Sequence, residues 1–356
     1  MTTLALSLLA ILLSILAVFG HQWVTLVPRL GIGVLYHLRR IRVGLAALSI
    51  GLAGVAFAIE QSPIQGGLFV VVLVLTPLSG FLHAGRLFVP IDDPLHVPAD
   101  GAGLADDAPV VGVEVDGRAH AWAVDDLIPH HVVNDAVGGQ PVLAAWCAYC
   151  NSGIVYDPTV GGDRLTFEPL AVYRRNMVMR DRETGTLWQH ATGEALTGPL
   201  AGTQLDVIGG GLSTWGPWRD EHSGTTIAVA PDEREWAGLL PRGRTRRLAD
   251  RTERVQLPGR TATDERLAFT EAVVGVEVEG RAKAYPVSAL RERGSIGDVV
   301  AGVPVSLTYE VDADRVRVTA GGASVPFQRT RWMGWFEFHP DTAVYEADPE
   351  GAVAAG

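Results

Sequence analysis

Only two cysteines occur in the 356 residues, and they lie three positions apart at Cys147 and Cys150. Two thiolates that converge bind soft or borderline metal ions, and a C-x-x-C segment is a common way to present them. They supply only half of a tetrahedral set, so histidine or methionine would have to complete it. His130 lies 17 residues before Cys147, a distance that one loop and one strand can fold back. We therefore predict a single metal ion held by Cys147, Cys150 and His130.

Two further side chains, Met177 and His190, are candidates for a fourth ligand, and solvent is the third candidate. Two thiolates and an imidazole suit copper, zinc or iron, and the sequence does not choose among these metals. If the fourth position is open, the centre would belong to a metal oxidoreductase or a Lewis-acid enzyme of unknown substrate.

Other interpretations of the cysteine pair stay open. Free cysteine is among the most buried residue types, so the pair could be plain packing. It could also be a metal-free thiol–disulfide redox module, although a redox C-x-x-C normally opens a helix and Asn151-Ser152-Gly153 follows here. A metal could also act only as a fold staple in a non-catalytic binding or scaffold domain. Metal analysis and reversible thiol titration separate these cases.

The chain around the cysteines has the pattern of an α+β fold that is mostly β. Two alternating segments flank an Asp116-Gly117 turn signal, which predicts a hairpin over Val110–Val115 and Arg118–Val124. A straight strand would send the cysteines to opposite faces, so a turn after Cys147 is needed to bring the sulfurs together. Further predicted elements are a strand at Pro141–Trp146, a short helix at Trp215–Glu221 and a strand at Thr226–Ala230.

Part of this β-rich segment occurs twice. Residues 110–122, VVGVEVDGRAHAW, reappear at 273–285 as VVGVEVEGRAKAY, and the same offset aligns Asp135 with Asp298. Because Asp135 persists in both copies, we interpret it as turn or cap chemistry. We therefore expect two related β-rich repeats that form one soluble unit, with the metal site in the first repeat only. At the positions of His130, Cys147 and Cys150 the second repeat has Arg293, Glu310 and Ala313.

The expected domain boundaries place the metal-bearing repeat at 91–240, an Arg-rich connection at 241–266 and the degenerate repeat at 267–356. Residues 1–90 are expected to form about three transmembrane helices, because three apolar stretches approach the roughly 20 residues that cross a bilayer. These stretches lie at about 2–27, 43–59 and 66–85.

The charged residues between the expected helices predict how the bundle is oriented in the membrane. The segment between the first two helices carries Arg29, Arg39, Arg40 and Arg42, whereas only Glu60 lies between the second and third. Basic loops face the cytoplasm, so a three-helix count places the soluble domain on the cytoplasmic side of a multi-pass membrane protein. The bilayer is then the partner of the N-terminal helices, and an even helix count would reverse the orientation.

The soluble part is strongly acidic, since 24 of the 29 basic residues but 39 of the 40 acidic residues lie from residue 91 onward. Binding to nucleic acid depends on clustered lysine and arginine. The sequence therefore predicts no nucleic-acid partner, and its acidity is explained most simply by solubility. A small-molecule or protein substrate is not identified by these patterns.

From about Asp92 to Ala230 the chain resembles the family of domain of unknown function 3179. The motifs that carry the resemblance are HHVVND at 130–135, WCAYC at 146–150 and RDRETGTLW at 180–188. It implies that His130, Cys147 and Cys150 are functional positions, and that Asp181 and Trp188 belong to the scaffold. Three positions depart from the family pattern: His131, where an acidic residue is usual, Trp146, the aromatic residue before the first cysteine, and His190, where glutamine is usual. The resemblance implies a site but no reaction.

Overall fold

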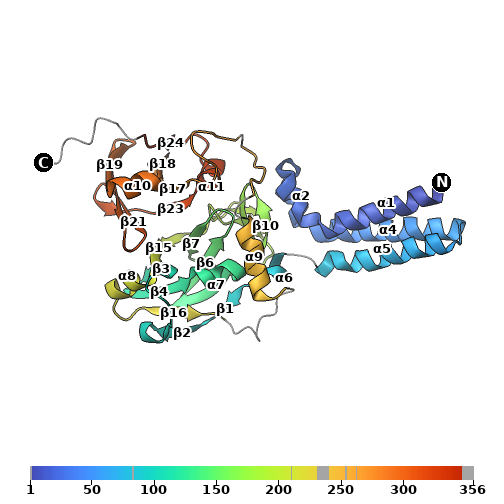
Figure 1. Ribbon diagram of the computed structural model, residues 1–356, viewed down its shortest axis with the longest axis horizontal. Helices are drawn as coiled ribbons and strands as arrows, with labels where there is room; N and C mark the ends of the chain where they lie inside the picture. Colours follow the sequence, from blue (N-terminus) through green and yellow to red (C-terminus); the bar gives the residue numbers. More distant parts are fainter. Residues whose placement is uncertain are drawn as a thin grey trace.

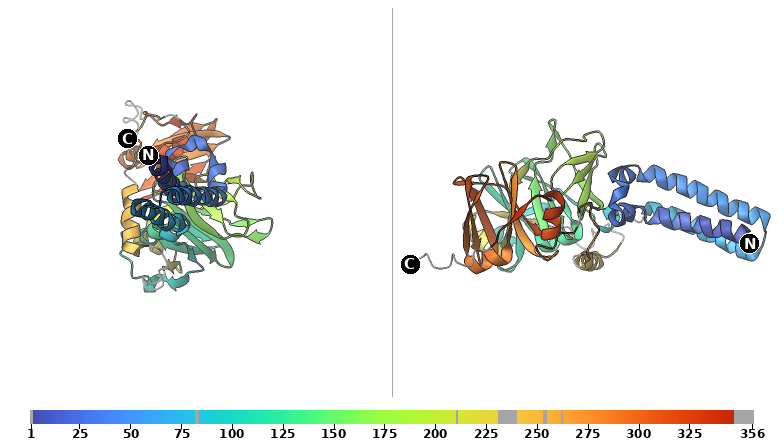
Figure 2. Two further views of the ribbon diagram at one scale, coloured as in Figure 1. Left: turned by 90° about the vertical axis from the view of Figure 1, so that its right-hand side faces the viewer. Right: turned by 90° about the horizontal axis from the view of Figure 1, so that it is seen from above.

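The computed structural model describes residues 2–81, 84–209, 211–230, 240–252, 255–261 and 263–346. The expected end of the second repeat, 347–356, lies outside these residues. The described chain has two parts: N-terminal helices run together away from a mostly β domain (Figures 1 and 2).

The N-terminal part contains two or three candidate membrane spans, as the sequence predicts. Helix α4 (Leu38–Ile59) and residues Pro63–Gly80 of α5 (Pro63–Phe81) are long and apolar enough to cross a bilayer. The expected first span is broken into α1 (Thr2–Val18) and α2 (Gly20–Leu26), which meet at 74° and make a third span if counted together. The 3-10 turn η1 (Pro28–Leu30) and helix α3 (Ile32–Tyr36) lead into α4, and α6 (Ala84–Leu87) follows α5.

Arg42 stabilises the bend between α1 and α2. A helix that ends leaves its last carbonyl groups without intrahelical partners. The Arg42 guanidinium donates to the carbonyl oxygens of Ala17 at 2.9 Å and Val18 at 3.1 Å. Between the long helices, the hydroxyls of Ser14 and Ser49 lie 2.6 Å apart, the type of polar contact that joins helices in a bilayer. The bundle is therefore held by short polar contacts as well as by packing.

The strands of the β domain form five sheets of four or five strands and one two-stranded ribbon. Sheet I has the order β1 (Ile91–Asp92), β5 (Val132–Val137), β6 (Gln140–Cys147), β7 (Ser152–Tyr156) and β14 (Val207–Gly209). Sheet II has the order β15 (Gly211–Thr214), β3 (Pro109–Val115), β4 (Arg118–Ala123), β16 (Thr226–Val229) and β2 (Leu95–Pro98). Sheet III has the order β10 (Phe167–Tyr173), β11 (Asn176–Asp181), β12 (Leu187–Gln189) and β13 (Ala195–Thr197).

The C-terminal strands form the other two sheets. Sheet IV has the order β23 (Phe327–Arg331), β17 (Ala272–Val278), β18 (Arg281–Pro286) and β24 (Ala343–Val344). Sheet V has the order β19 (Ser295–Val300), β20 (Val303–Glu310), β21 (Arg315–Ala320) and β22 (Ala323–Ser324), and the ribbon pairs β8 (Thr159–Val160) with β9 (Asp163–Arg164). The connecting helices are η2 (Ala99–Gly101), α7 (Val124–His130), α8 (Trp215–Glu221), α9 (Arg242–Thr252), α10 (Val287–Arg293) and α11 (Trp332–Phe338).

Sheet I is buried on both faces, which explains the nearly continuous apolar run of β6. Side chains alternate across a strand. Val142, Ala144 and Trp146 pack with residues of sheet II in one core. Their neighbours Leu143, Ala145 and Cys147 pack with residues of sheet III in a second core. Sheets II, I and III therefore lie as three layers, and sheets IV and V share a separate core.

The β domain does not divide into two repeats as the sequence predicts, because its strands are distributed over five sheets. Two of these sheets nevertheless contain the same arrangement of four strands. Strands β15-β3-β4-β16 of sheet II and β23-β17-β18-β24 of sheet IV follow one order, with the last pair parallel in each. Helix α8 follows β15 and helix α11 follows β23, so the equivalent hairpins are covered by equivalent helices.

A glycine lies under a tryptophan in each of these sheets. A Cβ added to Gly112 would lie 2.6 Å from the ring of Trp218, and one added to Gly275 would lie 2.3 Å from the ring of Trp335. Overpacking of this kind costs about 1–3 kcal/mol. We expect Gly275→Ala to lower the free energy of unfolding by that amount in denaturant titrations of the full chain. Gly297→Ala, where no atom lies within 4 Å, is the control, and equal losses for both variants would contradict the packing argument.

Candidate metal centre

Three potential metal ligands meet between sheets I and II. His96 lies on β2, His120 on β4 and Asp135 on β5, and one ligand atom from each lies within 4.8 Å of the others. Among the residues that the structure describes, this is the one group of three or more histidine, cysteine or acidic side chains at such distances. The sequence analysis missed it.

Strand pairing brings the two histidines together. Strand β16 lies between β2 and β4, with Thr226 opposite His120 and Ala228 opposite His96. The imidazole centroids lie 4.0 Å apart, and the Thr226 hydroxyl lies 2.7 Å from His120 Nδ1. A hydrogen bond at Nδ1 fixes the ring and leaves Nε2 to face the carboxylate. The hairpin that the sequence predicts thus presents His120 toward sheet I.

Asp135 is held by several donors. Its Oδ1 lies 2.8 Å from His96 Nε2 and accepts from the Ala136 N–H at 2.7 Å. Its Oδ2 accepts from Trp122 Nε1 at 2.9 Å and lies 3.5 Å from His120 Nε2. The interpretation of Asp135 as a turn or cap residue is therefore wrong, because it lies inside β5 with its carboxylate facing the histidines.

The electrostatics favour a neutral imidazole beside an ionised carboxylate. Burial lowers the pKa of His120 below its ordinary value, in spite of the neighbouring Asp135. Burial alone would raise the pKa of Asp135, but the imidazoles of His120 and His96 lower it. His120 is fully buried and its Nε2 has no hydrogen-bond partner. A buried polar atom of this kind is costly unless something satisfies it.

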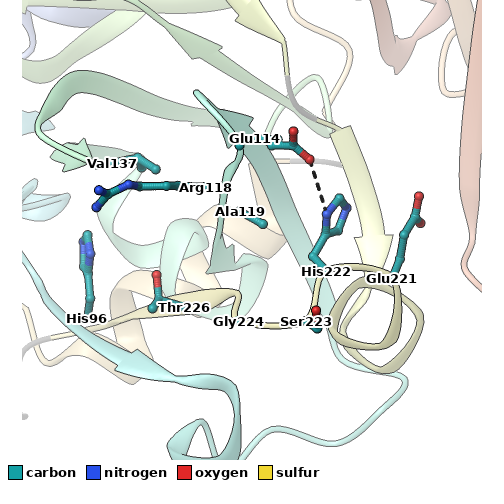
Figure 3. A pocket seen from close by; sticks show the side chains of 12 residues that line it. His96, Glu114, Arg118, Ala119, Val137, Glu221, His222, Ser223, Gly224 and Thr226 are labelled. Carbon is teal, nitrogen blue, oxygen red and sulfur yellow. Dashed lines mark ion pairs between the residues drawn. The ribbon is translucent and has the colours of Figure 1, made fainter.

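A cavity of about 520 Å³ lies beside the cluster and has His96 and Thr226 in its wall. Figure 3 shows Arg118 near His96 and, farther along, Glu114 facing His222. The Glu114 carboxylate and His222 Nδ1 are 3.6 Å apart. The cavity thus has both cationic and anionic groups in its wall. They lie next to His96, whose side chain is the most exposed of the three potential ligands.

The second half of the domain has a cation at the corresponding place. Lys283 occupies the position of His120 in the equivalent hairpin, and its Nζ lies 2.6 Å from Asp298 Oδ2. Tyr285 replaces Trp122 and donates to the same carboxylate oxygen at 3.0 Å. A cavity of about 580 Å³ again lies alongside, with Glu277 and His339 in its wall. An aspartate that faces an ammonium group in one half thus faces two imidazoles in the other.

The cysteines predicted as ligands lie in the core between sheets I and III. The expected turn follows Cys147, and the Cys150 N–H lies 3.4 Å from Cys147 Sγ. Cys150 Sγ donates to the Arg175 carbonyl oxygen at 3.0 Å and accepts from Asn176 Nδ2 at 3.1 Å. Both thiols are free and buried. Burial alone would raise the pKa of Cys147, but hydrogen bonds from Cys150 lower it, whereas burial raises that of Cys150 well above its usual range.

Within the described part of the chain, neither His130 nor His190 forms a three-ligand cluster with this pair. His190 Nδ1 lies 3.1 Å from Asn176 Oδ1, and its Nε2 lies 3.1 Å from the Ala145 carbonyl oxygen. Met177 is buried in the same core as both cysteines. His130 Nδ1 lies 2.6 Å from the Val89 carbonyl oxygen.

The next residue, His131, adopts a positive φ of 65° and stacks on Phe88. Burial lowers its pKa to about 4. Asp181 accepts from Trp188 Nε1 at 2.8 Å and from the Thr184 N–H at 2.6 Å, which fits the scaffold role that the resemblance implies for Asp181 and Trp188.

Comparison with known proteins places the chain in a family without assigning it a reaction. No curated protein and no solved structure matches the sequence. One family model matches residues 89–323, a range that contains His96, His120, Asp135 and both cysteines. Since this match covers more than half of the chain, the protein belongs to the family described as protein of unknown function (DUF3179).

Proposed function

We propose that this protein is a membrane-anchored, metal-dependent enzyme whose single metal ion is bound by His96, His120 and Asp135. The observation that carries the proposal is the fully buried His120 Nε2, which has no hydrogen-bond partner and faces a carboxylate 3.5 Å away. A metal ion between them would satisfy both groups. In the other half of the domain the Lys283 ammonium supplies the cation at this place.

Two imidazoles and one carboxylate suit iron(II) or zinc. Three protein ligands leave positions open, and an open position is what distinguishes a catalytic metal site from a structural one. The cavity beside His96 gives a substrate access to the cluster, and Arg118 favours a substrate with an anionic group. The reaction would be metal-assisted hydrolysis or oxidation, because a bound metal can activate water or exchange electrons.

The charge pattern supports a cytoplasmic location for the β domain. The segment that carries Arg29, Arg39 and Arg40 lies at the end of the bundle that contacts the β domain, since α2 and α3 pack on β10 and β13. The connection between α4 and α5, with Glu60, lies at the opposite end, beside the N-terminus (Figure 1). Positive charge next to membrane helices marks the cytoplasmic side.

The test is metal loading of the purified full-length chain in detergent. We expect one equivalent of zinc or iron(II) to remain after dialysis. With cobalt(II) as a probe, ligation by nitrogen and oxygen gives a spectrum without thiolate-to-metal charge transfer. Intense near-ultraviolet charge-transfer absorption would place the ion on the cysteines, and no retained ion would exclude the proposal.

Trp122 gives a more specific prediction, because its indole N–H positions the Asp135 carboxylate. Loss of a hydrogen bond to a metal ligand typically lowers metal affinity by about 10–100-fold. We expect Trp122→Phe to weaken metal binding by that factor in competition titrations with a chelator. Tyr285→Phe removes the corresponding bond to Asp298 and is the control, so an equal loss there would contradict the assignment.

The cysteine pair supports a second candidate, a thiol–disulfide redox module or a thiolate metal site. The specific observation in its favour is the opposite direction of the two pKa shifts, which makes Cys147 the more readily ionised thiol. His190 and Met177 lie nearby as further ligands for copper, zinc or iron. Reversible oxidation of both thiols in metal-free protein would favour the redox module, and the charge-transfer band described above would favour the thiolate site.

A further inference from the structure

A large cavity lies at the junction between the helical bundle and the β domain. Its volume is about 970 Å³, and its wall is formed by the start of α4, the end of α5 and part of sheet III. The cationic members of the wall are Arg39, Arg40, Arg42 and Arg180, and no aspartate or glutamate is among its lining residues. The wall of the cavity is therefore basic, whereas the β domain as a whole is acidic.

The arginines of α4 have no carboxylate partner among the residues that the structure describes. No ion pair joins Arg39, Arg40 or Arg42 to a carboxylate within the ranges that the structure describes. Arg42 is fixed by the carbonyl groups at the end of α1, and Arg39 and Arg40 are exposed. Arg180 differs, because it pairs with Glu168. Three guanidinium groups within one turn of helix thus face a cavity without a counter-charge.

The cavity lies at the ends of two candidate spans, which is the level of the headgroups when such helices cross a bilayer. Arg39 and Arg40 belong to the first turn of the candidate span α4, and Thr76 and Gly80 belong to the last turns of α5. Apolar lining residues continue from the arginines along the spans, among them Val43, Ala46 and Pro77. The junction is held in place by a hydrogen bond from the Thr25 hydroxyl to the Val172 carbonyl oxygen and by a shared core that includes Leu35, Leu38, Leu170 and Leu187.

We propose that this junction cavity binds the headgroup of an anionic phospholipid. Arginine forms strong, charge-assisted hydrogen bonds with phosphate oxygens, and basic pockets at the ends of membrane helices bind anionic headgroups. The lipid chains would follow Val43 and Pro77 into the bilayer. The site is separate from the metal cluster, and its occupant would join the first turn of α4 to sheet III.

The test uses the full-length chain in mixed micelles that contain phosphatidylglycerol, phosphatidylcholine or free glycerol phosphate. Native mass spectrometry counts retained lipid, and a thermal scan gives the unfolding midpoint. We expect phosphatidylglycerol to be retained and to raise the midpoint, whereas phosphatidylcholine and glycerol phosphate do neither. A basic residue next to an anionic headgroup contributes about a 5-fold factor in binding, so Arg39→Gln combined with Arg40→Gln should weaken retention about 25-fold.

Arg29→Gln is the matched control, because Arg29 belongs to the same basic segment but does not line the cavity. It should retain phosphatidylglycerol as the parent does. A loss of about 5-fold in the control, the same factor per arginine as in the double variant, would show a diffuse charge effect and overturn the site. Equal retention of phosphatidylcholine would overturn the charge argument, and tight binding of glycerol phosphate would show a small-anion site in place of a lipid site.

Discussion

A His120→Lys variant is expected to fold and to lose stoichiometric metal binding. The change removes one of three ligands and brings an ammonium group next to Asp135, where it competes with a metal ion. The fold should tolerate it, because Lys283 already occupies the equivalent position and lies 2.6 Å from Asp298. Loss of a direct ligand costs more than the roughly 10–100-fold that follows from loss of an outer hydrogen bond. Elemental analysis after dialysis measures the metal, and the unfolding midpoint reports the fold.

Two other variants make this experiment specific. His222→Ala changes the cavity wall without touching the cluster, so it should retain the metal. Lys283→His should not create a second site, because among the described strands sheet IV has no counterpart of β2, the strand that carries His96. A His120→Lys protein that still retains one ion per chain would contradict the proposed site and direct attention to Cys147 and Cys150.

Local elements were predictable because their signals are local. The hairpin of β3 and β4, the strand β6 and the helix α8 lie where alternation and turn residues place them. The apolar N-terminal helices were predictable for the same reason. The bend after Val18 was not, because it is stabilised by Arg42, a residue on another helix.

The metal cluster could not be predicted from spacing, because β16 joins the two histidines. Strand β16 comes more than a hundred residues after His120 in the chain, yet it pairs with both β2 and β4. The comparison of the two halves did contain a signal, since His120 corresponds to Lys283. Asp135 persists as Asp298 because each is a carboxylate that faces a basic side chain, two imidazoles in the first half and an ammonium group in the second.

The surroundings of the cysteines could be predicted only in part from the sequence. The structure contains the predicted turn after Cys147, and Met177 lies in the same core as both cysteines. What completes the surroundings of Cys150 is a backbone carbonyl and a side-chain amide of the β10–β11 hairpin, at Arg175 and Asn176. Backbone groups leave no trace in residue types, so a search for histidine and methionine ligands does not find them.

That hairpin depends on one distant carboxylate, Glu337 of α11. Its turn residues Arg174 and Arg175 both have positive φ, 53° and 55°. Residues other than glycine adopt this backbone conformation only at a cost in free energy. Glu337 is fully buried and accepts from Arg174 Nε at 3.3 Å and Arg175 Nη1 at 3.1 Å. It also accepts from the Arg260 N–H at 2.8 Å. One side chain of the second half thus holds the strained turn and the connecting segment together.

Glu337→Ala is therefore expected to lower the free energy of unfolding by about 3–5 kcal/mol, the cost of leaving a buried charge without its partner. The unpaired charge would be Arg175, which is only 6% exposed. The matched control is Asp220→Ala on α8, the equivalent helix position in the first half. Asp220 is exposed and pairs only with Arg219 among the described residues, so its loss should change stability by less than about 1 kcal/mol. Denaturant titration of the full chain, followed by tryptophan fluorescence, measures both variants.

The Glu337 variant should also change the reactivity of Cys150. Because the backbone carbonyl oxygen of Arg175 accepts the hydrogen bond from the Cys150 thiol, loosening this turn should make that thiol react faster with a thiol reagent. A Glu337→Ala protein as stable as the Asp220 variant would show that the turn holds its own conformation.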